Sequence, residues 1–488
     1  MKILQISNGL PPVDRGGVEV YTLALSKSLR SKGHDVAVFC REPGGNRPIY
    51  SVRDEITEGI PARFVVNRFD GTTPLASRYF DRQIEALFAR WLEAQQPDVI
   101  HFQHTHGLSA SLLARAAEMG LPFVMTLHDY WYMCPQVNLL RPDNNLCIGS
   151  HHDVNCYECL FDRPYPPFGP NAPDFDAPLS LPSVEPVNLR PLSLSDATYY
   201  PLQRILPWPA RRLLLSIYDV MRLRVLPQAQ SLLAAVRPTN MEPLRVRARY
   251  MQALLALCKY IIAPSNVVKT QYVDFGIPAK RIRVVPHGID MSVWEDFQPS
   301  HRPRGQVLRF GYIGSLLRHK GVDFIIRAFQ RLDVPNTELW IHGFELPGMP
   351  FTEMLHELAD GDPRVHFAGP YTPPELPSIL NQIDVLLIPS RWHETFSIVT
   401  REAVLARLPV IASRMGGIPD AIDDGVNGIL LPPDDMEAWV AAMQRAVGDR
   451  ELVAALHRAQ LIRKVKSMDE HAVELIQLYA QMQDDLPR

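Results

Sequence analysis

No apolar run in the sequence is long enough to cross a bilayer, so it contains no candidate membrane-spanning helix. The opening MKILQISNGLPP lacks the long apolar core and the cleavage site of a secretory signal peptide. Neither sign of charge dominates, because 50 basic and 53 acidic side chains give a formal net charge of −3. These absences predict a cytoplasmic protein without a general attraction to nucleic acid.

Cysteine is scarce, with six residues in 488, yet four of the six fall in one short loop. These four are Cys134, Cys147, Cys156 and Cys159. A CxxC pair with two further cysteines is typical of a structural zinc site, for which His151 and His152 are alternative ligands. A reducing cytoplasm disfavours disulfides, so the open alternatives to zinc are free thiols and a redox pair.

Short apolar runs alternate with helix-length stretches along most of the chain. The first series runs from KILQIS (2–7) to RIRVVPHG (281–288), and the second from RFGYIGSL (309–316) to GILLPP (428–433). Strands that alternate with helices predict a parallel, doubly wound sheet. Two such series predict an α/β fold of two Rossmann-like domains facing a cleft between the carboxyl ends of their strands. The predicted divisions are 1–160, an insertion at 161–245, the end of the N-terminal domain at 246–288, the C-terminal domain at 289–468 and a closing helix at 469–488.

The insertion at 161–245 departs from this alternation. Its first part, 164–191, is too rich in proline for a long helix or a central strand. Its second part, 210–226, predicts an amphipathic helix, and five arginines against one aspartate in 201–227 give that stretch a charge of +4. A basic amphipathic helix can rest on an anionic membrane surface, or it can pack on its own domain.

The stretch RWHETFSIVTREA (391–403) holds two glutamates, Glu394 and Glu402, with seven residues between them. The preceding run IDVLLIPS (383–390) predicts a buried strand, so the whole segment is predicted to form a strand, a sharp turn and a helix. Glu394 would then lie in the turn and Glu402 in the helix. Backbone N–H groups at the start of such a helix commonly hold a phosphate.

Three glycine turns also follow predicted strands. NGLPPVDRGGVEVY (8–21) places Gly16 and Gly17 before a helix, GSLLRHKGVDF (314–324) adds two cations, and SRMGGIPDAI (413–422) is the third. Glycine lets a backbone approach a phosphate or a sugar without interference from a Cβ atom. Each turn alone is compatible with an ordinary loop, whereas all three beside paired carboxylates predict a site for a phosphorylated ligand.

The segment PSRWHETFSIVTREAVLARLPVIASRMGGIPDAIDDGVNGILLPPDD (389–435) resembles the signature of the retaining glycosyltransferases of family 4, which have the GT-B fold. PPVDRGGVEVYTLALSKSLRSKGHDVAVF, IIAPSNVVKTQYVDFGIPAKRIRVVPHGID and YIGSLLRHKGVDFIIRAF resemble the opening, the domain crossing and the donor-phosphate loop of that family. The resemblance covers most of the chain except 160–245. It implies transfer of a sugar from a nucleotide-sugar donor to a hydroxyl acceptor, without a catalytic metal. The expected acceptor is a glycan or a lipid-linked glycan in cell-surface polysaccharide or glycolipid synthesis.

The resemblance also assigns roles to individual residues. It implies that Glu394 contacts the donor sugar, that Glu402 holds the nucleotide ribose, and that His128 lies near the reacting carbon, with Lys320 neutralising the diphosphate. The residues implied around the donor diphosphate are Gly16, Gly17, Gly314, Ser315, Arg318, Lys320, Phe396, Ser397 and Ile398. Two positions depart from the family pattern: Ser397 replaces a glycine, and Ser315 replaces an arginine for which Arg318 could compensate.

Two further functions are compatible with this pattern. One is a GT-B sugar-nucleotide epimerase, and the other is a non-catalytic partner subunit that binds a nucleotide sugar or a glycan. The intact glutamate pair, lysine and histidine favour the transferase. Three histidines near strand ends, His101, His104 and His106, could line an acceptor cleft or simply pack within the domain.

Overall fold

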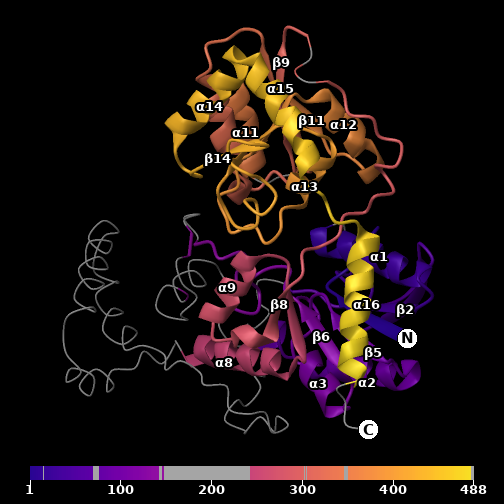
Figure 1. The fold of residues 1–488 in the computed structure, drawn as a ribbon. Helices are drawn as coiled ribbons and strands as arrows, with labels where there is room; N and C mark the ends of the chain where they lie inside the picture. Colours follow the sequence, from indigo (N-terminus) through magenta and orange to yellow (C-terminus); the bar gives the residue numbers. More distant parts are fainter. Residues whose placement is uncertain are drawn as a thin grey trace, which may run out of the picture.

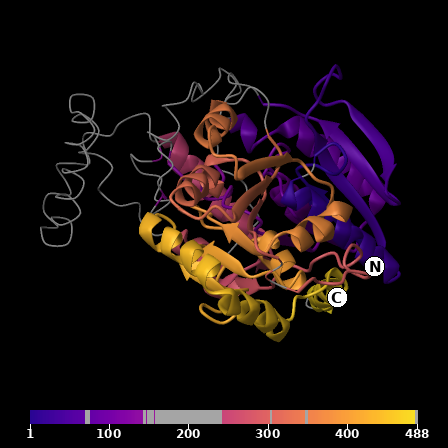
Figure 2. The same ribbon diagram turned by 90° about the horizontal axis from the view of Figure 1, so that it is seen from above.

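Two largely parallel sheets, each with its own helices, make up the computed structural model (Figure 1). The structure describes residues 1–14, 16–69, 76–141, 146, 147, 156, 242–301, 303, 305–345 and 350–484. The proline-rich stretch at 164–191 and the amphipathic helix predicted at 210–226 therefore lie outside the described residues. The C-terminal domain lies over the N-terminal domain, as the view from above also shows (Figure 2).

Within the described residues, the N-terminal sheet has eight strands in the order β3-β4-β2-β1-β5-β6-β7-β8. They are β1 (Lys2–Ser7), β2 (Asp35–Glu42), β3 (Val52–Thr57), β4 (Ile60–Val66), β5 (Val99–Phe102), β6 (Phe123–Thr126), β7 (Tyr260–Ala263) and β8 (Ile282–Val284). The helices of this domain are α1 (Gly17–Ser31), α2 (Arg82–Gln95), α3 (Leu112–Glu118), α8 (Glu242–Leu257) and α9 (Asn266–Asp274). The central strand β1 pairs in parallel with β2 and β5, and burial on both faces explains why these strands are rich in apolar residues.

One strand of this sheet departs from the predicted parallel pattern. β3 pairs with β4 in an antiparallel hairpin, whose turn consists of Glu58 and Gly59, both with positive φ angles of 47° and 84°. Positive φ at both central residues is the geometry that joins two adjacent strands tightly. The β3 sequence VRDEIT exposes most of its side chains at the sheet edge, so it lacks the apolar run that predicted the other strands.

Within the described residues, the C-terminal sheet has six strands, all parallel, in the order β11-β10-β9-β12-β13-β14. They are β9 (Leu308–Ile313), β10 (Thr337–His342), β11 (Val365–Gly369), β12 (Val385–Ile388), β13 (Val410–Ser413) and β14 (Gly428–Leu431). The helices are α10 (Val322–Gln330), α11 (Pro350–Ala359), α12 (Leu376–Gln382), α13 (Ile398–Leu405), α14 (Met436–Gly448) and α15 (Arg450–Ala459). The two predicted Rossmann-like domains are therefore both observed.

The last helix, α16 (Met468–Asp484), returns to the N-terminal domain and packs beside α1 (Figure 1). Its buried Tyr479 belongs to the same core cluster as Tyr21 of α1. At the crossing, Gly288 lies so close to the segment before α16 that an added Cβ would come within 2.5 Å of the Ser467 carbonyl oxygen. The chain thus passes between the two domains twice, along adjacent paths.

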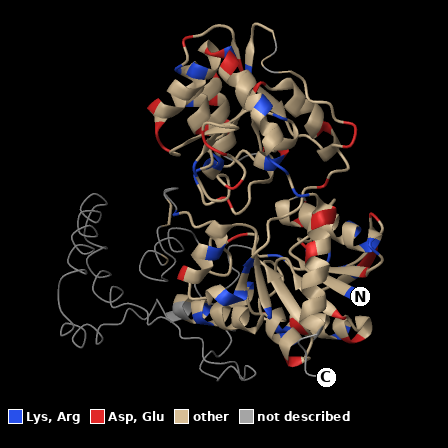
Figure 3. Ribbon diagram, in the orientation of Figure 1, with Lys and Arg blue, Asp and Glu red and all other residues tan. Residues whose placement is uncertain are grey.

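Basic and acidic side chains are scattered over both domains (Figure 3), in keeping with the small net charge. In the part of the chain that the structure describes, no helix combines the length and the apolar character needed to cross a bilayer.

Candidate active site

Glu394 lies in the loop between β12 and α13, as the sequence predicts, and the residue is 7% exposed. Its Oε1 atom accepts hydrogen bonds from Lys320 Nζ at 2.6 Å and from Ser390 Oγ at 2.8 Å. Burial alone would raise the pKa of Glu394, but the Lys320 ammonium and these hydrogen bonds hold it below its ordinary value. Glu394 is therefore a charged carboxylate beside a cation at the carboxyl end of the sheet.

Two of the glycine turns shape the Glu394 loop. The Gly417 N–H donates to the Glu394 carbonyl oxygen at 2.6 Å, and a Cβ on Gly416 would come within 2.1 Å of that same oxygen. Gly321 has a φ of 76°, and an added Cβ there would come equally close to the Pro389 carbonyl oxygen. The turn at 413–422 therefore packs against the loop through its glycines, and its part in a site for a phosphorylated ligand stays a prediction.

The start of α13 lies directly after this loop. Ser397 adopts a left-handed conformation with φ of 60°, and its hydroxyl lies 2.6 Å from the Thr400 hydroxyl. Glycine adopts such a conformation without a steric cost, which explains why the family pattern has glycine at this position. Because the first N–H groups of a helix have no acceptor within it, the backbone at Ile398 and Val399 is suited to an anion.

Glu402 lies on α13 and is partly buried. Burial raises its pKa to about 7, and its neighbours include Tyr371. Among the described residues, the structure shows no hydrogen bond or ion pair to the Glu402 carboxylate. A desolvated carboxylate without a partner is costly unless a ligand uses it, so Glu402 is a candidate acceptor for ligand hydroxyls.

The loop predicted to bind the donor phosphate follows β9. Gly314 has φ of 148° and donates its N–H to the His342 carbonyl oxygen, while the Ser315 carbonyl oxygen accepts from the Tyr312 hydroxyl. Lys320 ends the short 3-10 helix Arg318–Lys320 and reaches Glu394. The guanidinium of Arg318 lies over the Phe351 ring, 4.7 Å from its centroid. Arg318 therefore has an aromatic contact. That it takes the role of the arginine that Ser315 replaces stays a prediction.

Residues from the N-terminal domain meet the loop between β12 and α13. His128 follows β6, and its carbonyl oxygen accepts a hydrogen bond from Thr395 Oγ1 at 2.8 Å. Gly17 opens α1 after Gly16, and a Cβ on Gly17 would lie 4.0 Å from the side chain of Ile398. The structure thus brings Gly17, His128 and the β12–α13 loop together from opposite ends of the sequence.

One charged residue of the site, Arg401, was missed by the sequence analysis. Arg401 of α13 is buried, and its Nη1 donates to the carbonyl oxygens of Phe396 and, at 2.9 Å, of Gly417. Burial lowers the pKa of this guanidinium to about 10, so it remains charged at neutral pH. Arg401 binds the loop to the glycine turn behind it. The one available signal was an arginine directly before Glu402, and nothing in the sequence shows which carbonyl groups it reaches.

The three strand-end histidines have different surroundings. His101 is fully buried, with Nδ1 2.5 Å from the Tyr479 hydroxyl and Nε2 2.7 Å from the Thr126 hydroxyl. His104 is also buried and pairs with Asp129 at 2.9 Å. Burial lowers the pKa of the third, His106, to about 3. His101 therefore has a structural role within the domain, while His104 and His106 remain candidates for the acceptor side.

The predicted zinc loop is only partly described. Cys134 and Cys147 are near each other, and burial raises the pKa of the Cys134 thiol to about 11. Cys156 is half-buried, whereas Cys159, His151 and His152 lie outside the described residues. Within the described ranges, no three side chains of the metal-binding types come together. Binding of zinc by this loop stays a prediction.

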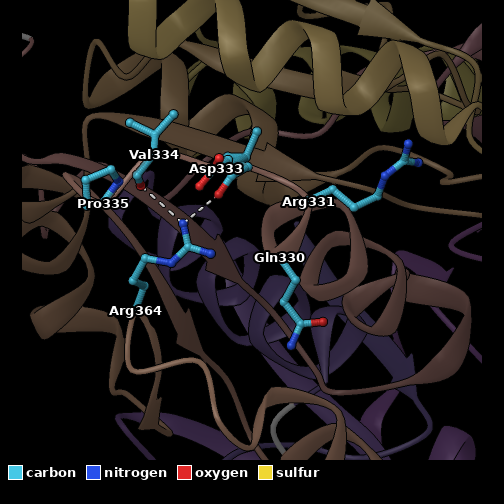
Figure 4. Close-up of a pocket in the computed structure, with 7 residues that line it drawn as sticks. Gln330, Arg331, Asp333, Val334, Pro335 and Arg364 are labelled. Atoms are coloured by element: carbon cyan, nitrogen blue, oxygen red, sulfur yellow. Dashed lines mark hydrogen bonds between the residues drawn. The ribbon is translucent and has the colours of Figure 1, made fainter.

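A pocket of about 610 Å³ lies at the opposite end of the C-terminal sheet (Figure 4). It is lined by residues before β10, and Arg364 donates to the Leu332 and Val334 carbonyl oxygens at its wall. Because the site described above lies at the carboxyl ends of the strands, this pocket at their amino ends is separate from it.

Two families match the chain. Residues 15–147 and 202–293 match the family described as Glycosyltransferase Family 4, and residues 308–449 match Glycosyl transferases group 1. D-inositol 3-phosphate glycosyltransferase of Corynebacterium jeikeium is 34% identical over 194 residues, which is 36% of this chain and 45% of that protein. The enzyme of the same name from Corynebacterium kroppenstedtii is 30% identical over 192 residues, 37% of this chain and 41% of that protein. The chain thus spans less than half the length of these relatives.

Solved structures resemble the whole chain. Sucrose-phosphate synthase from Thermosynechococcus elongatus has a TM-score of 0.63 at 18% identity, covering 99% of this chain and all of that one. Anabaena HepE in complex with UDP and glucose has a TM-score of 0.59 at 15% identity, with both chains fully covered. These likenesses confirm the predicted two-domain fold. The chain belongs to the family 4, group 1 glycosyltransferases and has the GT-B fold.

Proposed function

We propose that the chain transfers a sugar from a nucleoside diphosphate sugar to a hydroxyl group of an acceptor. The observation that carries the proposal is the pair of glutamates at the start of α13. Glu394 is ionised beside Lys320, while Glu402 is desolvated and without a partner among the described residues. The Glu394 carboxylate is suited to the sugar hydroxyls of the donor, and the Glu402 carboxylate is suited to its ribose hydroxyls.

The chemistry that these groups favour is cleavage of the bond between the sugar and the diphosphate. As this bond breaks, its electron pair and negative charge move to the leaving phosphate oxygen. Lys320 and the N–H groups at the start of α13 would stabilise that charge without a metal ion. His128 and Gly17 complete the surroundings from the N-terminal domain, where contact between the domains excludes water.

The proposed outcome is retention of configuration at the sugar carbon. The acceptor hydroxyl would attack on the face that the diphosphate leaves, and its proton would pass to a phosphate oxygen. The new bond joins the acceptor oxygen to the sugar carbon, and a nucleoside diphosphate is released. Family membership supports this stereochemistry.

The acceptor that we propose is a glycan or a lipid-linked glycan in polysaccharide or glycolipid synthesis, with the protein in the cytoplasm or at the cytoplasmic face of the membrane. The arginine-rich stretch at 201–227 supports a membrane-bound acceptor, because its charge of +4 favours an anionic surface. Nothing in the global charge favours a nucleic acid partner.

Incubation of the purified protein with radiolabelled nucleotide sugars tests the proposal. Transfer predicts a labelled glycosylated acceptor together with free nucleoside diphosphate. An epimerase would also cleave its donor but would label no acceptor, and a non-catalytic binding subunit would release nothing. Glu394→Gln, which removes the charge and keeps the size, should abolish the release that the wild type shows.

A further inference from the structure

A chain of buried polar side chains connects His128 with the C-terminal helix. His128 Nε2 lies 2.8 Å from Gln103 Oε1, and Gln103 Nε2 donates to Gln5 Oε1 at 2.7 Å. The Gln5 side chain in turn lies next to the hydroxyl of Tyr479 on α16, and its Nε2 atom makes no hydrogen bond within the described residues. Gln5, Gln103 and Tyr479 are all fully buried. Side chains in such a position are held by their partners, because water cannot replace a lost hydrogen bond there.

The orientation of the Gln103 and Gln5 amides determines which nitrogen of His128 carries hydrogen. Since the amide nitrogen of Gln103 donates to Gln5, its amide oxygen faces His128 Nε2. A carbonyl oxygen only accepts hydrogen bonds, so with the Gln103 amide in this orientation Nε2 is the protonated nitrogen. A neutral ring with hydrogen on Nε2 has a bare Nδ1, which can accept a hydrogen bond from a hydroxyl group.

The imidazole of His128 is neutral at physiological pH. Burial and the neighbouring His104 and His471 lower its pKa to about 3, although Asp129 acts in the opposite direction. The titratable side chains that face this ring from the surrounding elements are Tyr21, His101, His104, Asp129, His287 and His471.

The plane of the His128 ring is held as well. The His287 ring stacks on it with centroids 4.8 Å apart, and Tyr21 meets it edge to face at 4.8 Å. The Tyr21 hydroxyl lies 2.6 Å from Nε2 of His471 on α16. The C-terminal helix therefore supports His128 at its Nε2 edge through Tyr479 and at its face through His471.

We propose that Gln103 is a positioning residue that fixes His128 as the Nε2–H tautomer, supported by Gln5 and Tyr479, so that Nδ1 presents a lone pair to a substrate hydroxyl. The catalytic consequence rests on the proposed transferase function. The tautomer itself rests only on the hydrogen bonds of the folded chain.

Gln103→Glu tests the catalytic consequence. A carboxylate at this position still accepts the Nε2–H bond, but it draws a second proton onto the ring and turns Nδ1 into a donor. Nucleoside diphosphate affinity should stay unchanged, while kcat at neutral pH should fall by about tenfold or more and recover as the pH is raised. Gln444→Glu, on an exposed position of α14, is the matched control and should keep the wild-type pH profile. An unchanged profile for Gln103→Glu, or a loss independent of pH, would overturn the proposal.

Nitrogen chemical shifts of the His128 ring test the tautomer without any turnover. The wild type should show a protonated Nε2 and an unprotonated Nδ1, and the reverse pattern would overturn the assignment. Tyr479→Phe keeps the ring and removes the hydroxyl, so it should lower kcat with KM unchanged and mix the two tautomers. A single unchanged tautomer in that variant would remove α16 from the proposal. If the wild type releases no nucleoside diphosphate, the proposed function fails, and the nitrogen shifts still decide the tautomer.

Discussion

The ionised Glu402 carboxylate is predicted to lower the free energy of unfolding at the pH where it would accept hydrogen bonds from a ligand. Burial raises its pKa from the ordinary 4.5 to about 7. A carboxyl group with a raised pKa gives its full stability below the ordinary pKa, and that stability is lost as the pH rises from there through about 7. The difference between the two pKa values corresponds to about 3 kcal/mol of unfolding free energy at pH 8.

Glu402→Gln removes this cost because an amide of the same size does not ionise. We expect the variant to be more stable than the wild type by about 3 kcal/mol at pH 8 and by less than about 1 kcal/mol at pH 5. Urea unfolding followed by tryptophan fluorescence measures both differences. The same variant should bind the nucleotide donor more weakly, seen as a raised donor KM, because an amide is a poorer acceptor for ribose hydroxyls.

Two results would refute this reasoning. Equal stability of the two proteins at pH 8 would mean that the Glu402 carboxylate is solvated or paired. An unchanged donor KM would mean that Glu402 is a helix residue without a role in binding, even if the stability difference appears.

Four shorter predictions concern other parts of the chain. Glu394→Ala should abolish transfer and leave circular dichroism unchanged, because Glu394 lies in a loop, and wild-type turnover would reject its role. Ser397→Gly should keep activity, whereas Ser397→Val should lower the unfolding free energy by about 1–2 kcal/mol, because a β-branched residue resists the positive φ at this position; equal stability of the two variants would argue against this. Metal analysis of protein prepared without added zinc should find about one zinc per chain in the cysteine loop, and metal-free protein of full stability would end that hypothesis. Flotation with anionic vesicles should need the arginines of 210–226 and weaken with salt, and protein that stays in the soluble fraction at low salt would favour a soluble acceptor.

The β12–α13 segment could be predicted because its signals are local. A four-residue apolar strand ends at Ile388, polar residues follow, and a helix begins at Ile398. Parallel strands buried on both faces have strong apolar patterns, so the two domains could also be predicted and are confirmed. β3 had no such pattern because its side chains are mostly exposed at an edge.

Contacts between distant segments could not be predicted. The close approach of Gly416 to Glu394 and the carbonyl contacts of Arg401 depend on how loops pack in three dimensions. The connection between His128 and Tyr479 joins residues more than three hundred positions apart through two buried glutamines. Buried glutamines have no sequence signature that separates them from exposed ones, so these partners appear only in the fold.

Binding of nucleoside diphosphates, measured by titration calorimetry, tests the central claim most directly. One nucleoside diphosphate should bind the wild type, and Lys320→Met should weaken it by about tenfold to a hundredfold, because a charge-assisted hydrogen bond to phosphate is lost. Arg331→Met removes an equal charge at the opposite end of the same domain, beside the pocket of Figure 4, and should leave the affinity unchanged. If no nucleoside diphosphate binds, or if both variants bind it equally well, the carboxyl-end site is not a donor site.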